Sequence, residues 1–348
     1  LQIITIGTIE MKKIDVNTKE RKYTIHLGCG ALNEAGSVIG EVCGNGSVFI
    51  ITDSGVPEKW VNVLVEQLGM PPIFAFEQGE ASKNIEVYGE ILAWLAEQKA
   101  TRKSLIVALG GGVTGDMAGF AAATYMRGIE YINIPTTSLS QIDSSVGGKT
   151  AIDHGGIKNI VGAFHQPSAV IVDPEVLSTL SEGERNNGLA EAVKAGLIGD
   201  GELFELFEHD DYMDHIEEII ERALIVKKRI VEEDERESNL RKILNFGHTF
   251  GHAYESYFGG RYLHGECVAM GMMTVTEDEE IRARLAAVLG RLGLPTAPEE
   301  DASSEELMNL IMNDKKSGGG SVDLVRVKKI GTAVIEPTGM EEIREMLK

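Results

Sequence analysis

The sequence has few cysteines and no long apolar run. Its 348 residues include three cysteines, Cys29, Cys43 and Cys267, which form no Cys-x-x-Cys pair. A disulfide framework is therefore excluded, and a reducing, cytoplasmic location is expected. No apolar stretch approaches the roughly 20 residues that span a bilayer. The first ten residues, LQIITIGTIE, contain no basic region or cleavage site, so no secretory signal is expected.

Positive charge is also scarce. Lysine and arginine number 33 against 54 aspartates and glutamates, which gives a net charge of −21. This excess disfavours a broad nucleic-acid surface or an anionic membrane as partner. It also makes any local cluster of basic residues informative. The apolar fraction of 43% and charged fraction of 25% are ordinary for a globular protein, and the length suffices for two domains.

The chain shows two successive patterns of predicted secondary structure. In the first half, short β-rich runs alternate with helical patterns; the runs are 23–27, 47–52, 73–76, 104–109, 131–134 and 170–172. This alternation predicts a doubly wound, Rossmann-like α/β domain over residues 1–174. After Pro174 the patterns are mostly helical, at 184–199, 212–235, 240–257, 267–275 and 280–292, with a strand pair near 323–335. They predict a mostly α-helical domain over 175–348, and the cleft between the domains is the expected active site.

A glycine loop follows the fourth of these β-rich runs. Gly110, Gly112 and Gly115 have GxGxxG spacing before a small-residue helix, which suits close approach of backbone N–H groups to a diphosphate. A tight strand-to-helix turn explains the same spacing. The acidic residue of the usual dinucleotide fingerprint is missing, because Glu130 precedes the next strand. Asp53 ends an earlier strand and can accept a ribose hydroxyl or cap a turn.

The segment 241–252 carries a polar stripe. Arg241, Asn245, His248 and His252 are spaced by 4, 3 and 4 residues, so on one helix they share a face. A solvated face usually mixes Glu and Lys, and a buried face carries Leu and Ala, so the stripe indicates a functional surface. Gly247 and Gly251 form a GxxxG step that lets another element approach closely.

Further segments supply partners for this stripe. Glu191 and Lys194 lie three residues apart in an otherwise apolar helical pattern, and His264 and Glu266 begin another. Two imidazoles and a carboxylate make a divalent-metal set with positions open for substrate oxygens. From spacing alone, the histidines are either His248 with His252 or one of these with His264.

A long Ser-, Gly- and Thr-rich segment occupies residues 135–165 and carries Asp143, Lys149, Lys158 and Asn159. Structureless segments of this length in a compact domain are usually functional. With Lys194, Lys227, Arg241 and Lys315 or Lys316, its lysines could line one basic pocket for phosphate and carboxylate oxygens. For each lysine alone, a solvated surface position is the simpler interpretation.

Together these segments resemble the 3-dehydroquinate synthase family. The resemblance rests on GGGVTGDMAGFAAATYMRG, IPTTSLSQIDSSVGGKTAID, GLAEAVKAGLI, DERESNLRKILNFGHTFGHAYE, LHGECVAMGM and DKKSGGGSVDLVRVKKIGTAVI, which occur in the family's order between about residues 47 and 336. It implies Glu191, His248 and His264 as ligands of a divalent metal, zinc or alternatively cobalt. His252 then becomes a phosphate-binding and proton-transfer residue.

The resemblance also implies the other site residues. Catalytic roles fall to His252, Lys149, Lys194 and Asn245. Substrate would be bound by Arg127, Asp143, Lys149, Asn159, Lys194, Lys227, Arg241, Asn245, His252, Lys315 and Lys316, with Arg127 reaching the substrate phosphate of a neighbouring subunit in a homodimer. NAD would be bound by Asp53, Glu80, Lys83, Gly111, Gly112, Val113, Thr114, Gly115, Asp116, Thr136, Thr137, Lys158 and Thr179.

The implied reaction converts 3-deoxy-D-arabino-heptulosonate 7-phosphate into 3-dehydroquinate, a step of the shikimate pathway of aromatic amino acid biosynthesis. It comprises transient oxidation of the C5 hydroxyl by NAD+, phosphate elimination, re-reduction and intramolecular aldol closure. Alternatives are another sugar phosphate cyclase, of the inosose or valiolone type, a metal-dependent polyol dehydrogenase, and a non-catalytic nucleotide-binding module. The sequence departs from the family at Asp153 and Gly155, where Asn and Pro are usual, at Gly55, and in the short, acidic segment after Met272.

Overall fold

The computed structural model describes residues 11–299, 302–314 and 321–348. The chain divides into two compact units, Leu1–Leu180 and Ser181–Lys348. Each unit has its own architecture. Among the described helices, none is both long and apolar enough to cross a membrane.

The first unit is built on a seven-stranded sheet in the order β1-β2-β9-β6-β5-β3-β4. Its strands are β1 (Lys12–Asn17), β2 (Lys22–Leu27), β3 (Val48–Asp53), β4 (Ile73–Phe76), β5 (Leu105–Gly110), β6 (Glu130–Pro135) and β9 (Ala169–Val172). Only β1 and β2 pair antiparallel; all other pairs are parallel. The predicted doubly wound fold is confirmed.

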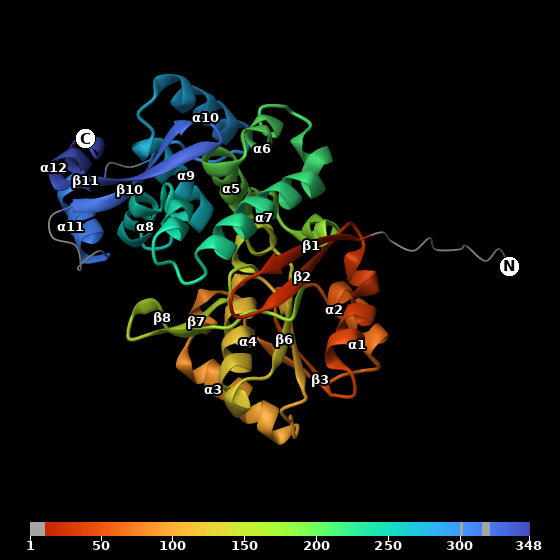
Figure 1. The fold of residues 1–348 in the computed structure, drawn as a ribbon. Helices are drawn as coiled ribbons and strands as arrows, with labels where there is room; N and C mark the ends of the chain where they lie inside the picture. The colour runs from red at the N-terminus through yellow and green to blue at the C-terminus, as the bar shows by residue number, and fades with distance from the viewer. Residues whose placement is uncertain (1–10, 300–301, 315–320) are drawn as a thin grey trace. The chain divides into compact units, whose positions relative to one another are not determined.

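Helices cover both faces of this sheet (Figure 1). They are η1 (Ala31–Glu34), α1 (Ala35–Cys43), α2 (Glu58–Leu68), η2 (Glu80–Ser82), α3 (Ile85–Glu97), α4 (Gly112–Thr124), η3 (Tyr125–Arg127) and η5 (Pro174–Thr179). The chain runs outward from β3 to β4 and then crosses to β5 on the other side of β3. The carboxyl ends of β3 and β5 are therefore at a topological switch point, where open α/β sheets bind ligands.

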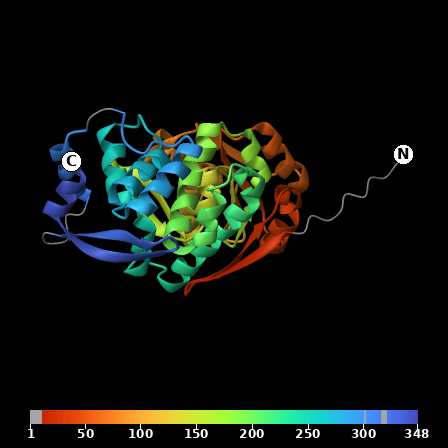
Figure 2. The same ribbon diagram turned by 90° about the horizontal axis from the view of Figure 1, so that it is seen from above.

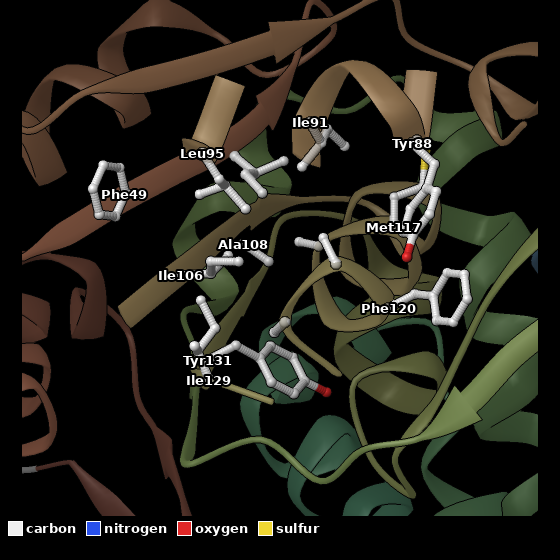
Figure 3. Packing of buried hydrophobic residues seen from close by; sticks show 14 of the residues in the cluster. Phe49, Tyr88, Ile91, Leu95, Ile106, Ala108, Met117, Phe120, Ile129 and Tyr131 are labelled. Carbon is white, nitrogen blue, oxygen red and sulfur yellow. The ribbon is translucent and has the colours of Figure 1, made fainter. Parts of the chain in front are cut away.

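One hydrophobic core packs α3 and α4 against this sheet (Figure 3). β5 is buried at every position, which explains its unbroken apolar run LIVALG, because a central parallel strand is covered on both faces. Tyr88 of α3 stacks on Phe120 of α4 with ring centroids 4.7 Å apart. This packing holds α4 behind β5 and so fixes the start of α4, where the glycine loop lies.

The Ser- and Gly-rich segment 135–165 has more structure than its sequence suggests. It contains a short π-helical turn, η4 (Ser140–Ser144), and an antiparallel hairpin of β7 (Lys149–His154) and β8 (Ile157–Phe164). The expectation of a structureless segment is wrong here. The turn of the hairpin uses Gly155 and Gly156, both with positive φ, which glycine adopts without strain.

The second unit is mostly helical, as predicted. Its elements are α5 (Glu182–Gly199), α6 (Gly201–Leu206), η6 (Tyr212–His215), α7 (Ile216–Glu233), η7 (Leu240–Asn245), α8 (His248–Tyr257), α9 (His264–Val275), α10 (Glu279–Arg291), α11 (Ser304–Asp314), β10 (Ser321–Lys329), β11 (Thr332–Gly339) and α12 (Met340–Met346). α5 begins with a capping box of Ser181 and Glu184. It is buried from Gly188 to Ile198, so its charged residues are placed in the interior.

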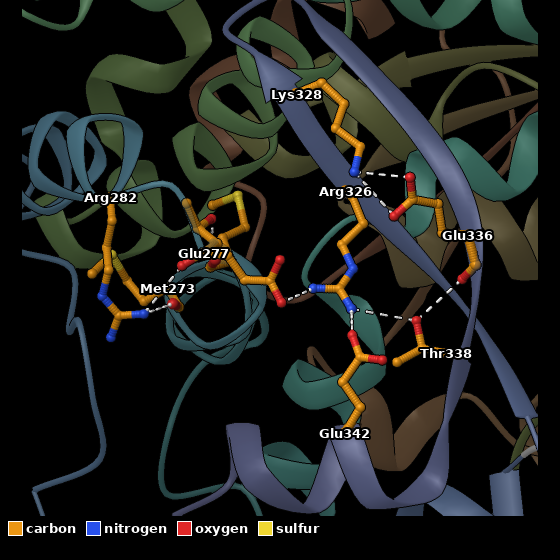
Figure 4. Close-up of polar contacts among 10 residues, drawn as sticks. Met273, Glu277, Arg282, Arg326, Lys328, Glu336, Thr338 and Glu342 are labelled. Carbon is orange, nitrogen blue, oxygen red and sulfur yellow. Dashed lines mark hydrogen bonds and ion pairs between the residues drawn. The ribbon is translucent and has the colours of Figure 1, made fainter.

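The β10–β11 hairpin lies beside the C-terminal helix in both views (Figures 1 and 2). Arg326 of β10 is buried and forms ion pairs with Glu277, just after α9, and with Glu342 of α12 (Figure 4). Lys328 pairs with Glu336 across the hairpin at 2.8 Å. The guanidinium therefore ties the hairpin both to the end of α9 and to α12.

Candidate functional site

The predicted stripe at 241–252 does not lie on one helix. Arg241 and Asn245 belong to the 3₁₀ segment η7, whereas His248 and His252 belong to α8. Gly247 separates them with φ 78°, a left-handed conformation that breaks an α-helix and that glycine tolerates. The assignment of all four side chains to a single helical face is therefore wrong.

α5 carries two buried opposite charges. Glu191 and Lys194 are 1% and 4% exposed at their side chains and form an ion pair within the helix. Pairing lowers the large cost of placing either charge in an apolar interior. The two charges in this otherwise apolar helix are therefore tolerated because they pair with each other.

Two histidines from different helices face Glu191. His248 begins α8 and His264 begins α9, and their Nε2 atoms lie 3.5 and 3.7 Å from Glu191 Oε1. These separations are too long for good hydrogen bonds. Among the described residues, neither Glu191 oxygen has a hydrogen-bond partner of good geometry although both are buried. A divalent cation would satisfy such a carboxylate, so the set fits a metal.

The outer nitrogens of both rings are already engaged. His248 Nδ1 lies 3.2 Å from the Phe246 carbonyl oxygen, and His264 Nδ1 lies 3.2 Å from Glu255 Oε2. Both acceptors require the proton on Nδ1. In the neutral form of either ring, Nε2 then carries a lone pair directed toward Glu191, which is the arrangement a metal-binding imidazole needs.

The charges of the three groups are set by their surroundings. Burial raises the pKa of Glu191, but Lys194, His248 and His264 outweigh it and hold the pKa well below the usual range. Burial and Lys194 lower the pKa of His248 to about 3, so its ring is neutral near pH 7. Burial lowers the pKa of His264, but contacts with Glu191 and Glu255 outweigh it and raise the pKa to about 9.

Among the described residues, Glu191, His248 and His264 form a group whose ligand atoms all lie within 4.8 Å of one another. His252 is outside this group. It lies one turn along α8, is exposed, and has its ring centroid 5.3 Å from that of His248. Of the alternatives left open by spacing, the geometry therefore pairs His248 with His264.

The other predicted residues of the second unit differ in exposure. Lys227 on α7 and Arg241 on η7 are buried, whereas Asn245 is exposed. The Arg241 guanidinium donates through Nη1 to the Glu235 carbonyl oxygen at 2.6 Å. Lys315 and Lys316 lie outside the described residues.

In the first unit, the glycine loop and Asp53 lie together. α4 begins at Gly112 with no side-chain cap, so its first N–H groups are available to an anion. Asp53, at the end of β3, accepts from Thr114 Oγ1 at 2.5 Å and from Gly55 N at 3.0 Å. A Cβ at Gly110 would lie 2.8 Å from Asp53 Oδ2, so only glycine allows this close approach.

Lys83 joins residues that the resemblance assigns to different ligands. Its ammonium donates to Asp116 Oδ2 at 2.6 Å and to Asn159 Oδ1 at 2.5 Å. Asn159 has a positive φ of 55° and donates its backbone N–H to Asp153 Oδ1 at 2.7 Å. Asp153, one of the departures from the family pattern, therefore fixes the hairpin that carries Asn159.

The remaining predicted residues of the first unit are placed as follows. Glu80, Arg127, Lys149, Lys158 and Thr179 are exposed, Asp143 and Thr137 are half-buried, and Thr136 is buried. Arg127 follows α4 with a positive φ of 71°. Thr179 accepts a hydrogen bond from Trp60 Nε1 at 3.0 Å.

Comparison with known proteins identifies the family. The N-terminal region model of 3-dehydroquinate synthase matches residues 73–187, and the C-terminal model matches residues 188–317. The chain is 41% identical to the 3-dehydroquinate synthase of Streptococcus sanguinis, covering 97% of this chain and 99% of the relative. It is also 41% identical to that of Thermoanaerobacter pseudethanolicus, covering 97% and 100%. The chain belongs to the 3-dehydroquinate synthase family.

Solved structures of other cyclases share the fold. A 2-deoxy-scyllo-inosose synthase complexed with carbaglucose-6-phosphate, NAD+ and Co2+ matches with a TM-score of 0.87 at 25% identity, covering 97% of this chain and 99% of that one. A 2-epi-5-epi-valiolone synthase from Streptomyces hygroscopicus with NAD+ and Zn2+ matches with a TM-score of 0.83 at 25% identity, covering 95% and 97%. An iron-containing alcohol dehydrogenase, with a TM-score of 0.65 at 16% identity, shares the fold alone.

Sequence reasoning assigned no role to three carboxylates of this family member. Glu255 contacts the outer nitrogen of His264, Asp153 fixes Asn159, and Asp234 organises the segment before Arg241. Glu255 had a detectable signal, because it lies seven residues after His248 and so on the same face of α8. Glu266, considered as a metal carboxylate, instead accepts from the Leu263 N–H at 2.6 Å and caps α9.

Proposed function

We propose that this chain converts 3-deoxy-D-arabino-heptulosonate 7-phosphate into 3-dehydroquinate and phosphate, with NAD and a divalent metal. The observation that carries the proposal is the buried Glu191 carboxylate, faced by two imidazole Nε2 atoms and paired with Lys194. The family relatives are named 3-dehydroquinate synthases, which are phosphate-eliminating cyclases. Identity of 41% over nearly the whole length, against 25% for the inosose and valiolone synthases, favours this substrate among sugar phosphates.

Glu191, His248 and His264 would hold the metal, with zinc or cobalt as the candidates. When bound, NAD supplies a reversible hydride acceptor, and a divalent cation supplies polarisation of a substrate hydroxyl and carbonyl. Lys194 stays within reach of Glu191 and contributes a fixed positive charge for a developing alkoxide. His252, which is exposed beside His248, would move a proton next to the phosphate.

The anionic groups of the substrate require cations. In the second unit, Lys227, Arg241 and Asn245 would bind substrate, together with Lys315 and Lys316. In the first unit, Lys149 would supply a cation, and Asp143 and Asn159 would bind other polar groups of the substrate. Buried Lys227 and Arg241 provide charges that solvent screens little, which suits phosphate and carboxylate oxygens in an otherwise acidic protein.

NAD would bind at the switch point of the sheet. The start of α4, residues 111–116, would receive the diphosphate, and Asp53 a ribose hydroxyl. Glu80, Lys83, Thr136, Thr137, Lys158 and Thr179 complete the proposed cofactor set. Because Lys83 bonds both Asp116 and Asn159, its ammonium would link the cofactor-binding loop to a substrate-binding side chain.

A homodimer and a cytoplasmic location are part of the proposal. Arg127 is exposed and lies in a left-handed turn after α4, where its side chain could reach the substrate phosphate bound to a second copy. The described residues contain no disulfide, which suits a reducing compartment. Sedimentation of the wild type and of Arg127→Ala, combined with their KM values, tests the dimer and the role of Arg127.

The deciding experiment uses purified protein with substoichiometric NAD+, a divalent metal and the heptulosonate phosphate. The expected result is many equivalents of inorganic phosphate released per NAD+ without net NADH. Stoichiometric NADH would instead indicate a polyol dehydrogenase. Phosphate release from glucose 6-phosphate, but not from the heptulosonate phosphate, would indicate an inosose-type cyclase. Glu191→Gln, which keeps the shape but removes the charge, is the matched inactive control.

A further inference from the structure

The segment between α7 and η7, residues 234–241, is held together by one carboxylate. Asp234 ends α7 and is 8% exposed. Its Oδ1 accepts from Ser238 N at 2.8 Å and from Ser238 Oγ at 2.9 Å. Its Oδ2 accepts from Asn239 N at 2.7 Å and from Arg241 N at 3.1 Å. Four donors on one carboxylate make this turn a defined structure.

The position of this carboxylate has a cost. The C-terminal end of a helix carries partial negative charge and disfavours an acidic side chain. Glu237, within the turn, adopts φ 59°, a left-handed conformation that costs energy for a residue other than glycine. Burial raises the pKa of Asp234, but the N–H groups of Asn239, Arg241 and Ser238 outweigh it and hold the pKa well below its usual range.

The turn fixes both the backbone and the guanidinium of Arg241. Its backbone N–H is bonded to Asp234, and its guanidinium is bonded to the Glu235 carbonyl inside the same turn. Arg241 is 2% exposed, so its side chain cannot find another orientation without moving the turn. A guanidinium held in one orientation can make two parallel hydrogen bonds to an oxyanion with little loss of entropy.

We propose that Asp234 is a positioning residue that folds the 234–241 turn so that Arg241 is presented in one orientation to an oxyanion of the substrate. The proposal rests on the proposed function in assigning substrate binding to Arg241. Asp234 itself does not touch the substrate; it acts through Arg241. Its removal should therefore weaken substrate binding and leave NAD and metal binding unchanged.

The test compares Asp234→Asn, Arg241→Ala and the double variant. The amide nitrogen of asparagine cannot accept from Asn239 and Arg241, so we expect KM for the heptulosonate phosphate to rise by roughly 10- to 100-fold. In the Arg241→Ala background the same change should have little further effect on KM. Independent, multiplying effects of the two substitutions on KM would overturn the proposal.

A second measurement is independent of activity. Hydrogen exchange of the Ser238, Asn239 and Arg241 amides should accelerate in Asp234→Asn, while exchange in α5 and α8 stays unchanged. Unchanged exchange rates of these three amides would overturn the proposal, whether or not Arg241 binds the substrate. If Arg241→Ala leaves KM unaltered, the proposed function of Arg241 fails instead. Should Asp234→Asn not fold, Ser238→Ala removes one donor and should give a smaller KM increase that is also absent in the Arg241→Ala background.

Discussion

At the scale of single residues, the acceptors on the outer imidazole nitrogens are expected to support the proposed metal site. Glu255 is the clearest case, because its Oε2 lies 3.2 Å from His264 Nδ1 while Nε2 of the same ring faces Glu191. A carboxylate on the outer nitrogen fixes the tautomer and raises the basicity of the inner one. Glu255 is thus expected to act on metal binding without contacting the metal.

Glu255→Gln is expected to lower the affinity for a divalent metal by about 10- to 100-fold. Competition with a chromophoric chelator above pH 9 measures this directly, since protons then compete weakly for His264, whose pKa is raised to about 9 by its contacts with Glu191 and Glu255 despite burial. Glu266→Gln is the matched control, because Glu266 caps α9 through Leu263 N. Equal losses of affinity in the two variants would contradict a specific role for Glu255.

Several site residues could be predicted from the sequence, and others could not. Glu191 and Lys194 stood out because charges in an apolar helix require a partner or a function. Spacing left the pairing of His248 with His264 undecided, and only the family resemblance implied it, because segments far apart in sequence converge only in the folded unit. Asp234 gave no signal, and Asp153 stood out only as a departure from the family pattern, since side-chain bonds to backbone N–H groups leave no periodic pattern in a sequence.

At the scale of elements, the strands were easier to predict than the helix ends. The six predicted β-rich runs all form strands of the central sheet, because buried parallel strands are short apolar runs bounded by turns. The predicted helix at 240–257 is interrupted, because η7 ends at Asn245 and the left-handed Gly247 precedes α8. Residue spacing alone cannot show that a glycine has positive φ.

The glycines of α8 and α9 bring these helices into backbone contact, as the GxxxG spacing predicted. A Cβ at Gly271 of α9 would lie 2.0 Å from the Gly247 carbonyl oxygen and 2.7 Å from Gly251 N. Gly271→Ala is therefore expected to reduce the free energy of unfolding by about 1–3 kcal/mol, because rigid backbone must move. Urea unfolding followed by circular dichroism measures the change.

Gly290 in α10 provides the control for this substitution. A Cβ there would meet no atom within 4 Å, so Gly290→Ala should leave stability unchanged or raise it by up to about 1 kcal/mol. If Gly271→Ala were as well tolerated as Gly290→Ala, the close contact of α8 and α9 would not be a constraint on the fold.

The turn after α7 also predicts a dependence of stability on pH. The N–H donors hold the pKa of Asp234 below its usual value of about 3.9, despite burial, so the ionised form is favoured in the folded state. This contribution is fully present above the unfolded pKa and is lost as pH falls through the folded pKa. Asp234→Asn should destabilise by about 1–3 kcal/mol at pH 7 and by progressively less below pH 4. A constant difference between the unfolding free energies from pH 7 to pH 3 would contradict this account.

At the scale of the whole molecule, the length allowed two domains, and the acidic composition made any local cluster of basic residues informative. The net charge of −21 first argues against an anionic substrate, yet the buried cations Lys194, Lys227 and Arg241 lie within an acidic unit. The fold class followed from the strand–helix alternation of the first half and the mostly helical patterns of the second half. The boundary after residue 174 stays a prediction, and the compact units themselves divide after Leu180.

Because the proposed NAD residues lie in the first unit and the metal group in the second, each ligand should protect a different set of amides from hydrogen exchange. A ligand that binds only the folded state stabilises the segments it contacts, by about 2.7 kcal/mol at one hundred times its Kd. NAD+ is expected to slow exchange at the end of β3 and the start of α4, and a divalent metal at α5, α8 and α9. Glu191→Gln should abolish the metal-dependent protection and keep the NAD-dependent one. Metal-dependent protection of α4 that persists in Glu191→Gln would place the metal elsewhere and overturn the assignment of Glu191, His248 and His264.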